Sequence, residues 1–151
     1  MEAVFQAGLP IGSMSVSALT KYALGDPGEE IRKKAMQIAE KSIELAVDLG
    51  VRTVMIPGYD IYFGESTIET KKYFLENVKK IAEIAEREGI LVGFETMENN
   101  FMNTTGKAVQ YVNMVDSAYL KIYPDAGNIT NAAVENQHDV CEDISLWVKE
   151  S

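Results

Sequence analysis

The sequence predicts an α/β fold in which parallel strands alternate with helices. Three short apolar runs rich in β-branched residues, at 51–57, 90–97 and 119–124, are each preceded by a stripe of apolar side chains at helical spacing. Residues 11–18 form a fourth candidate strand. Strands joined by whole helices must run parallel and be covered by those helices. The order therefore predicts either an open doubly wound sheet or part of a (βα)8 barrel, and sequence order alone does not choose between them.

Local signals predict where the two strongest helices begin and end. Asp26, followed by proline and glycine, is predicted to cap the first helix, which Gly50 should end. Ser66 is predicted to open a capping box at the start of the second helix, and Gly89 to end it. Each helix is followed within two residues by one of the apolar runs, as a repeating βα unit requires.

Composition restricts the class of protein. The 151 residues are 46% hydrophobic and 25% charged, which predicts a single domain over residues 1–151. The net charge of -9 disfavours binding to nucleic acid or to anionic membrane surfaces. Cys141 is the only cysteine, no apolar run approaches the roughly 20 residues that span a bilayer, and no export signal is visible. We therefore expect a cytoplasmic protein.

Polar side chains follow the predicted strands, where both candidate folds bind ligands. Side chains alternate along a strand, so Glu95 should face away from Phe94, which suits packing under the helices. Two carboxylates on adjacent strand ends repel each other, and a divalent cation is the simplest compensation. A pair of solvated carboxylates is the alternative. The candidate residues are Tyr59, Asp60, Glu95, Glu98, Asp125 and Asn128.

Four segments of the chain resemble one enzyme family. They read SMSVSALTKYALGDP, IPGYDIYF, GFETMEN and YPDAGNIT, and they fall in order at the four predicted strand ends. They are similar to L-ribulose-5-phosphate or L-xylulose-5-phosphate 3-epimerases, often called hexulose-6-phosphate isomerases, in the xylose-isomerase-like TIM-barrel superfamily. The similarity extends from about Leu9 to Asp143, so it covers nearly the whole chain.

The resemblance implies a (βα)8 barrel and a metal-dependent isomerase. Members hold a divalent metal with Glu, Asp, His and Glu from four strand ends, and the two glutamates exchange a proton beside the sugar carbonyl. By this match Glu95 is a metal ligand and the catalytic base, and Asp125 is a second metal ligand. Asn128, Glu98 and Tyr59 are the candidate substrate contacts. The implied metal is Mn²⁺, Mg²⁺ or Zn²⁺, and the implied substrate is a ketopentose 5-phosphate or a hexulose 6-phosphate.

The chain departs from that family in length. A complete barrel needs about 250 residues, and the resemblance covers only the third to sixth strands. The metal-binding histidine and the second glutamate belong to the seventh and eighth strands, and His138 follows the last predicted strand at the start of a helix. We therefore expect a truncated half barrel with half of a metal site, inactive by itself. Its uncovered strand edges and apolar faces favour a homo-oligomer.

Two other functions compete with an epimerase fragment. One is a catalytically silent assembly or binding module built on the half-barrel scaffold, which would show a stable oligomer without metal dependence or turnover. The other is a DNA-repair nuclease, because apurinic-site endonucleases share the superfamily fold. The net charge of -9 and the single histidine disfavour a nuclease, which needs a basic DNA-binding face and more metal ligands.

Overall fold

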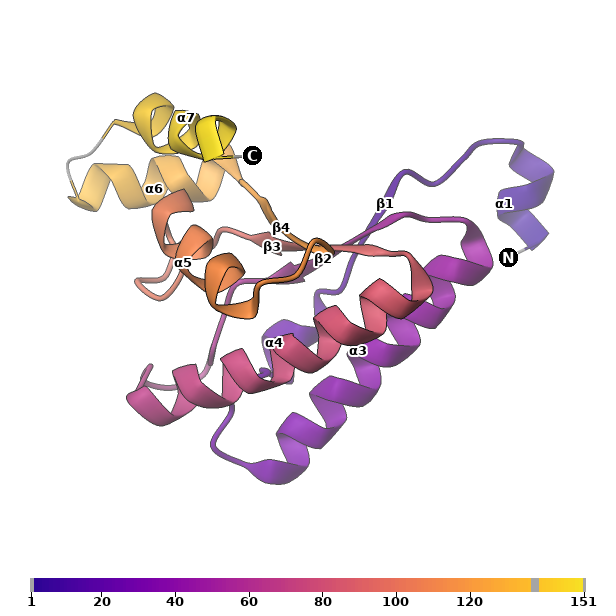
Figure 1. Ribbon diagram of the computed structural model, residues 1–151, viewed down its shortest axis with the longest axis horizontal. Coiled ribbons are helices and arrows are strands. Elements are labelled where there is room, and N and C mark those ends of the chain that lie inside the picture. The colour runs from indigo at the N-terminus through magenta and orange to yellow at the C-terminus, as the bar shows by residue number, and fades with distance from the viewer. Residues whose placement is uncertain (1, 137–138, 151) are drawn as a thin grey trace.

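The computed structural model describes residues 2–136 and 139–150, and a single four-stranded parallel sheet lies at its centre (Figure 1). The strands pair in the order of the sequence, β1-β2-β3-β4. Their bounds are β1 Ser13–Ser15, β2 Thr53–Pro57, β3 Leu91–Glu95 and β4 Leu120–Tyr123. The predicted parallel α/β architecture is confirmed. Strands added one after another on the same side are typical of consecutive units of a barrel, since a doubly wound sheet reverses its strand order.

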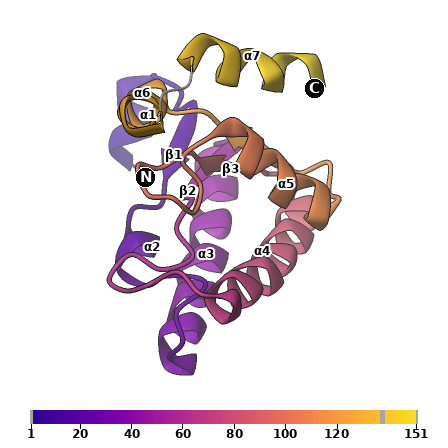
Figure 2. The same cartoon turned by 90° about the vertical axis from the view of Figure 1, so that its left-hand side faces the viewer.

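A helix follows each of the strands, and the two longest helices, α3 and α4, lie side by side (Figures 1 and 2). None of the helices among the described residues is both long and apolar enough to cross a membrane. The helices are α1 Glu2–Ala7, α2 Ala18–Lys21, α3 Glu29–Leu49, α4 Ile68–Glu88, α5 Thr105–Val115, α6 Ala126–Asn136 and α7 Val140–Glu150.

The two faces of the sheet differ in burial. Alternate strand residues are buried in one apolar core with α3, α4 and α5: Val54, Ile56, Val92, Phe94, Leu120 and Ile122. On the opposite face Leu91, Lys121 and Tyr123 are exposed. The alternation predicted from Phe94 and Glu95 is thus observed, and Lys121 lies on the uncovered face. This face is the one that would point into a barrel.

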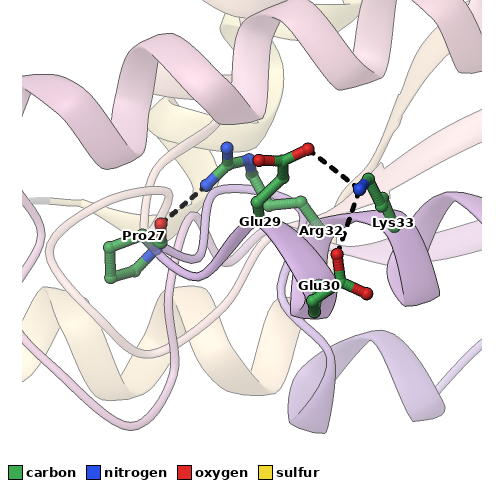
Figure 3. Close-up of polar contacts among 5 residues, drawn as sticks. All are labelled: Pro27, Glu29, Glu30, Arg32 and Lys33. Atoms are coloured by element: carbon green, nitrogen blue, oxygen red, sulfur yellow. Dashed lines mark hydrogen bonds and ion pairs between the residues drawn. The ribbon is translucent and has the colours of Figure 1, made fainter.

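The start of α3 differs from the prediction by two residues. The helix begins at Glu29 with Gly28 as its N-cap, so Asp26 is not the cap. The Asp26 carboxylate instead accepts the Gly28 amide at 2.7 Å, an Asx-type turn that competes with helix capping. The Arg32 guanidinium then closes the turn by donating to the Asp26 carbonyl oxygen at 2.6 Å. It also donates to the Pro27 carbonyl oxygen at 2.9 Å, as Figure 3 shows.

The start of α4 differs by one residue. Thr67, rather than Ser66, is the N-cap, and it forms a capping box with Thr70: the Thr67 side chain accepts the Thr70 amide at 3.1 Å, and the Thr70 hydroxyl accepts the Thr67 amide at 2.8 Å. The Ser66 hydroxyl is occupied elsewhere, because it donates to Asp60 at 2.6 Å. A tertiary partner therefore replaces the predicted local one.

Both predicted helix ends are confirmed. Gly50 and Gly89 follow α3 and α4 with φ of 71° and 68°, in the left-handed region that favours glycine. Each glycine turns the chain toward the next strand, and β2 begins three residues after Gly50 while β3 begins two residues after Gly89.

Candidate metal and substrate site

The predicted site residues gather where the carboxyl ends of the strands lie, the side of the molecule that Figure 2 faces. Glu95 is the last residue of β3, and in the sheet register it pairs with Pro57 of β2 and Tyr123 of β4. Asp125 comes two residues after β4 ends. The parallel register therefore brings Glu95 and Asp125 to neighbouring strand ends, as the sequence predicted.

Glu95 is a partly buried carboxylate with two others nearby. Burial raises the pKa of Glu95 above its usual value, and the negative charges of Asp125 and Glu98 raise it further. Within the described residues no hydrogen bond reaches its side chain, so both carboxylate oxygens are available to a ligand. An unpaired carboxylate of this kind is typical of a cation site or of a group that transfers protons.

Asp125 has a structural partner as well as a free oxygen. Its Oδ1 accepts the Asn128 amide at 2.7 Å, which caps the first turn of α6. Its own amide donates to the Thr96 hydroxyl at 2.8 Å, and the Asn128 side-chain amide donates to the Thr96 carbonyl at 3.0 Å. Buried Thr96 thus ties Asp125 and Asn128 to the residue that follows Glu95. Sequence analysis did not identify Thr96, since only the strand register shows its partners.

Tyr59 and Glu98 connect the loops that follow β2 and β3. The Tyr59 hydroxyl donates to Glu98 Oε2 at 2.7 Å, and the ring is 4% exposed while Glu98 is open to solvent. Burial raises the pKa of Tyr59 above its usual value, as do the bond to Glu98 and the charge of nearby Glu95. The phenol therefore stays protonated and holds the Glu98 carboxylate close to Glu95.

Asp60, also a strand-end candidate, has a different role. It is fully buried, and its Oδ2 accepts the hydroxyls of Ser66 and Thr70, both at 2.6 Å. Its Oδ1 has no hydrogen-bond partner among the described residues. Asp60 anchors the loop between β2 and α4 to the start of α4 and faces away from solvent.

The available oxygens fit part of a site for a hard divalent cation, because carboxylate oxygens are the donors that Mg²⁺ and Mn²⁺ prefer. Glu95 and the second oxygen of Asp125 are those donors. Among the described residues, no group of three or more His, Cys, Asp or Glu side chains is placed to hold a metal ion. His138 lies outside the described residues.

A parallel sheet of consecutive βα units with polar side chains at the strand ends defines a barrel-type α/β protein. Residues 2–146 match the family described as xylose isomerase-like TIM barrel, and the chain belongs to that family. It is 28% identical over 155 aligned residues to L-ribulose-5-phosphate 3-epimerase UlaE of Shigella boydii, an alignment that covers 100% of this chain and 55% of the relative. The chain thus spans about half the length of the curated relatives it matches.

Two solved structures share the fold. The structure of an L-ribulose 3-epimerase matches with a TM-score of 0.80 and 18% identity, over 97% of this chain and 50% of that chain. A xylose isomerase-like TIM barrel protein from Mycobacterium smegmatis, in complex with magnesium, matches with a TM-score of 0.69 and 22% identity, over 85% of this chain and 45% of that chain. The family predicted from the four sequence segments is confirmed.

Proposed function

We propose that this chain supplies two metal ligands, Glu95 and Asp125, to a sugar-phosphate 3-epimerase or isomerase acting on a ketopentose 5-phosphate or hexulose 6-phosphate. The observation that carries the proposal is the placement of both carboxylates on adjacent strand ends, joined through Thr96, with oxygens left free. The similarity to 3-epimerases supports the same chemistry. A bound Mn²⁺, Mg²⁺ or Zn²⁺ would polarise the carbonyl of the substrate.

The residues of this chain would carry the proton and position the sugar. Glu95, with its raised pKa, is suited to take the proton from the carbon beside the carbonyl. Epimerisation requires a second acid to return a proton on the opposite face, and the family resemblance assigns this to a glutamate on a strand that the chain does not match. Asn128, Glu98 and Tyr59 are the proposed contacts to substrate hydroxyls, which is supported by the bond of Tyr59 to Glu98 and by the bond of Asn128 to Thr96, the residue after Glu95. We expect no turnover from this chain alone.

A calorimetric Mn²⁺ titration tests the metal site. We expect weak binding, with a dissociation constant of roughly 10⁻⁴ to 10⁻³ M as for other weak carboxylate sites, because two carboxylates rarely hold Mn²⁺ tightly. Glu95→Gln and Asp125→Asn should each abolish it. Glu83→Gln, which neutralises an exposed carboxylate on α4, should leave the titration unchanged.

The same titration separates the other outcomes. Micromolar binding that both variants lose would show that another chain completes the site, and an assay with L-ribulose 5-phosphate should then detect epimerisation. Equal binding by the wild type and both variants would contradict the assignment of Glu95 and Asp125 as ligands.

A catalytically silent assembly module is the second candidate function. It is favoured by the sheet face that carries exposed Leu91 and Tyr123, and by the two edge strands of the described sheet, β1 and β4. Unpaired strand edges and exposed apolar side chains both favour association with another chain. Stable self-association without metal binding or turnover would support this function over the epimerase.

Association through the uncovered face predicts a homo-oligomer in solution. We expect Leu91→Lys to shift the chain toward monomer in sedimentation velocity experiments, because a charge would enter the contact. Val47→Lys, at a similarly exposed position on the outer surface of α3, should not alter the distribution. If the wild-type chain stays monomeric up to about 100 μM, this would rule out a homo-oligomer with a micromolar dissociation constant.

A further inference from the structure

A small cavity lies in the layer of helices, away from the strand-end carboxylates. The helices α4 and α5 are neighbours (Figure 2), and a cavity of about 270 Å³ lies between them and the loop that precedes α5. Both helices follow consecutive strands of this chain, so the cavity does not depend on the uncovered face of the sheet. Sites for drug-sized ligands have volumes of roughly 300–1,000 Å³, so this cavity suits a smaller ligand. Its lining includes Lys71 of α4, Lys107, Gln110 and Tyr111 of α5, and Asn100 and Phe101 of the loop.

The charge of this lining is unlike that of the chain as a whole. The chain has 23 acidic and 14 basic side chains, yet the described residues that line the cavity include two lysines and no carboxylate. The cavity between α3 and α4 is lined by Glu29 and Glu76 as well as by cationic side chains. Lys71 forms no ion pair with any described residue. An anion is therefore the ligand that this lining would stabilise.

Lys107 is held in place by neutral oxygen atoms. Its Nζ donates to the Asn100 carbonyl oxygen at 2.7 Å and to Asn103 Oδ1 at 2.6 Å. Asn103 is fully buried, and its side-chain amide donates to Asn100 Oδ1 at 3.3 Å, which fixes the two partners relative to each other. An ammonium group has three N–H donors, and these contacts occupy two of them. The third donor and the uncompensated positive charge remain available to a ligand.

The electrostatics of the lining also favour an anion. Burial lowers the pKa of Lys107 below its usual value, and the positive charge of Lys71 lowers it further, a repulsion that a bound anion would relieve. Burial and the charge of Asp60 raise the pKa of Tyr111 to about 12, so its hydroxyl is a neutral donor at physiological pH. Asp60 itself is fully buried and does not line the cavity. No hydrogen bond from the described part of the chain occupies the Tyr111 hydroxyl.

We propose that the cavity between α4 and α5 binds a phosphate group, as inorganic phosphate or as a phosphate monoester, between Lys71 and Lys107. The oxygens of a phosphate accept hydrogen bonds in several directions, and ionic hydrogen bonds of this kind are the strong ones. Two ammonium groups, the Tyr111 hydroxyl and the Gln110 side-chain amide are the donors around it. A planar carboxylate would use fewer of these donors.

This site is distinct from the metal and substrate site. The Tyr111 ring packs edge to face against Phe74 and Phe101, in the core on the helix side of the sheet. Glu95 ends β3 and faces the opposite side of the sheet from that core. A phosphate between α4 and α5 is therefore a second ligand, and its binding does not depend on the proposed function.

Phosphate titrations of the full chain, followed by amide NMR spectra, test the proposal. Sodium chloride at equal ionic strength is the reference, because salt screens surface charges without regard to site. We expect the signals of α5 and of the first turn of α4 to shift, with a dissociation constant on the order of 1 mM, since a few ionic hydrogen bonds provide the affinity. Glycerol 3-phosphate is the second probe. Tighter binding of this monoester would support a ligand whose carbon chain contacts Phe101, and equal binding would support recognition of the phosphate group alone.

Substitutions of single lysines locate the anion. Lys71→Gln should weaken phosphate binding about two- to fivefold, the usual value of an exposed ionic contact, and Lys71→Arg should restore it. Lys107→Gln should weaken binding about tenfold, because its ammonium group is partly buried. Lys72→Gln is the matched control, since it removes the same charge from the next residue of α4, which lies 3.9 Å from Glu76 and outside the cavity lining. It should leave the affinity for phosphate unchanged.

Three results would overturn the inference. The first is equal phosphate affinity in the wild type and Lys71→Gln, a variant that changes an exposed side chain without an ion pair among the described residues and so should fold normally. The second is a set of signal shifts that sodium chloride reproduces at the same ionic strength, or an equal loss of affinity in Lys72→Gln, since either would show general attraction to positive charge. The third is a set of shifts confined to the surroundings of Glu95 and Asp125, which would place the anion at the strand ends.

Discussion

Replacing Phe74 with alanine is expected to lower the free energy of unfolding by about 3–5 kcal/mol. Phe74 lies on α4 and is fully buried at the centre of the apolar core. Its ring stacks on Phe94 of β3 at 5.6 Å, and it meets Phe101 at 5.0 Å and Tyr111 at 5.6 Å edge to face. Alanine would leave a cavity between α4, β3, α5 and the loop that joins β3 to α5, and it would remove these ring contacts together.

Urea unfolding followed by circular dichroism measures this loss. Tyr73→Ala is the matched control, because Tyr73 is the preceding residue but is only partly buried, with Arg32 stacked 3.9 Å from its ring centroid. That change should cost about 0.5–1 kcal/mol, the value of an exposed cation–π contact. Equal losses in the two variants would contradict the placement of Phe74 at the centre of the core.

The orientation of the site could be predicted from the sequence because it follows from strand geometry. Phe94 and Glu95 are neighbours on β3, so burying the first under the helices turns the second toward the uncovered face. The glycines at the helix ends were predictable for a similar reason, since only a local backbone conformation is involved. Predictions that depend on one or two residues of local geometry therefore held.

Predictions that depend on which of several partners a polar group selects did not hold. Asp26 can cap a helix or close a turn, and it closes a turn with Gly28. Ser66 can cap α4 or bond a distant carboxylate, and it bonds Asp60. Thr96 could not be predicted from the sequence, because its hydrogen bond with the Asp125 amide forms only when β3 and β4 are in register. For Asp26 the competing partner is local, because Gly28 is two residues along the chain. The partners of Ser66 and Thr96 are six and 29 residues away, so they depend on how the loops and strands pack.

The placement of Glu95 depends on a glycine in the neighbouring loop. A Cβ atom at Gly58 would lie 2.6 Å from the Glu95 carbonyl oxygen and 2.6 Å from the Met102 sulfur, closer than such atoms approach in proteins. The Gly58 amide also donates to that Glu95 carbonyl at 3.0 Å. To remove the clash between this Cβ atom and the Glu95 carbonyl oxygen, either the end of β3 or the loop between β2 and α4 must move. We expect either movement to shift the Glu95 carboxylate relative to Asp125.

We accordingly expect Gly58→Ala to destabilise the chain by about 1–3 kcal/mol, as overpacking of a filled site does, and to weaken Mn²⁺ binding at least severalfold. Gly106→Ala is the control: its Cβ would meet nothing within 4 Å, and because Gly106 lies in α5 the change should stabilise by up to about 1 kcal/mol. Urea unfolding and the Mn²⁺ titration measure the two effects separately. If Gly58→Ala lost stability but kept its Mn²⁺ affinity, the loop between β2 and α4 would not position Glu95. The strand register and Thr96 would then be what holds Glu95 and Asp125 together.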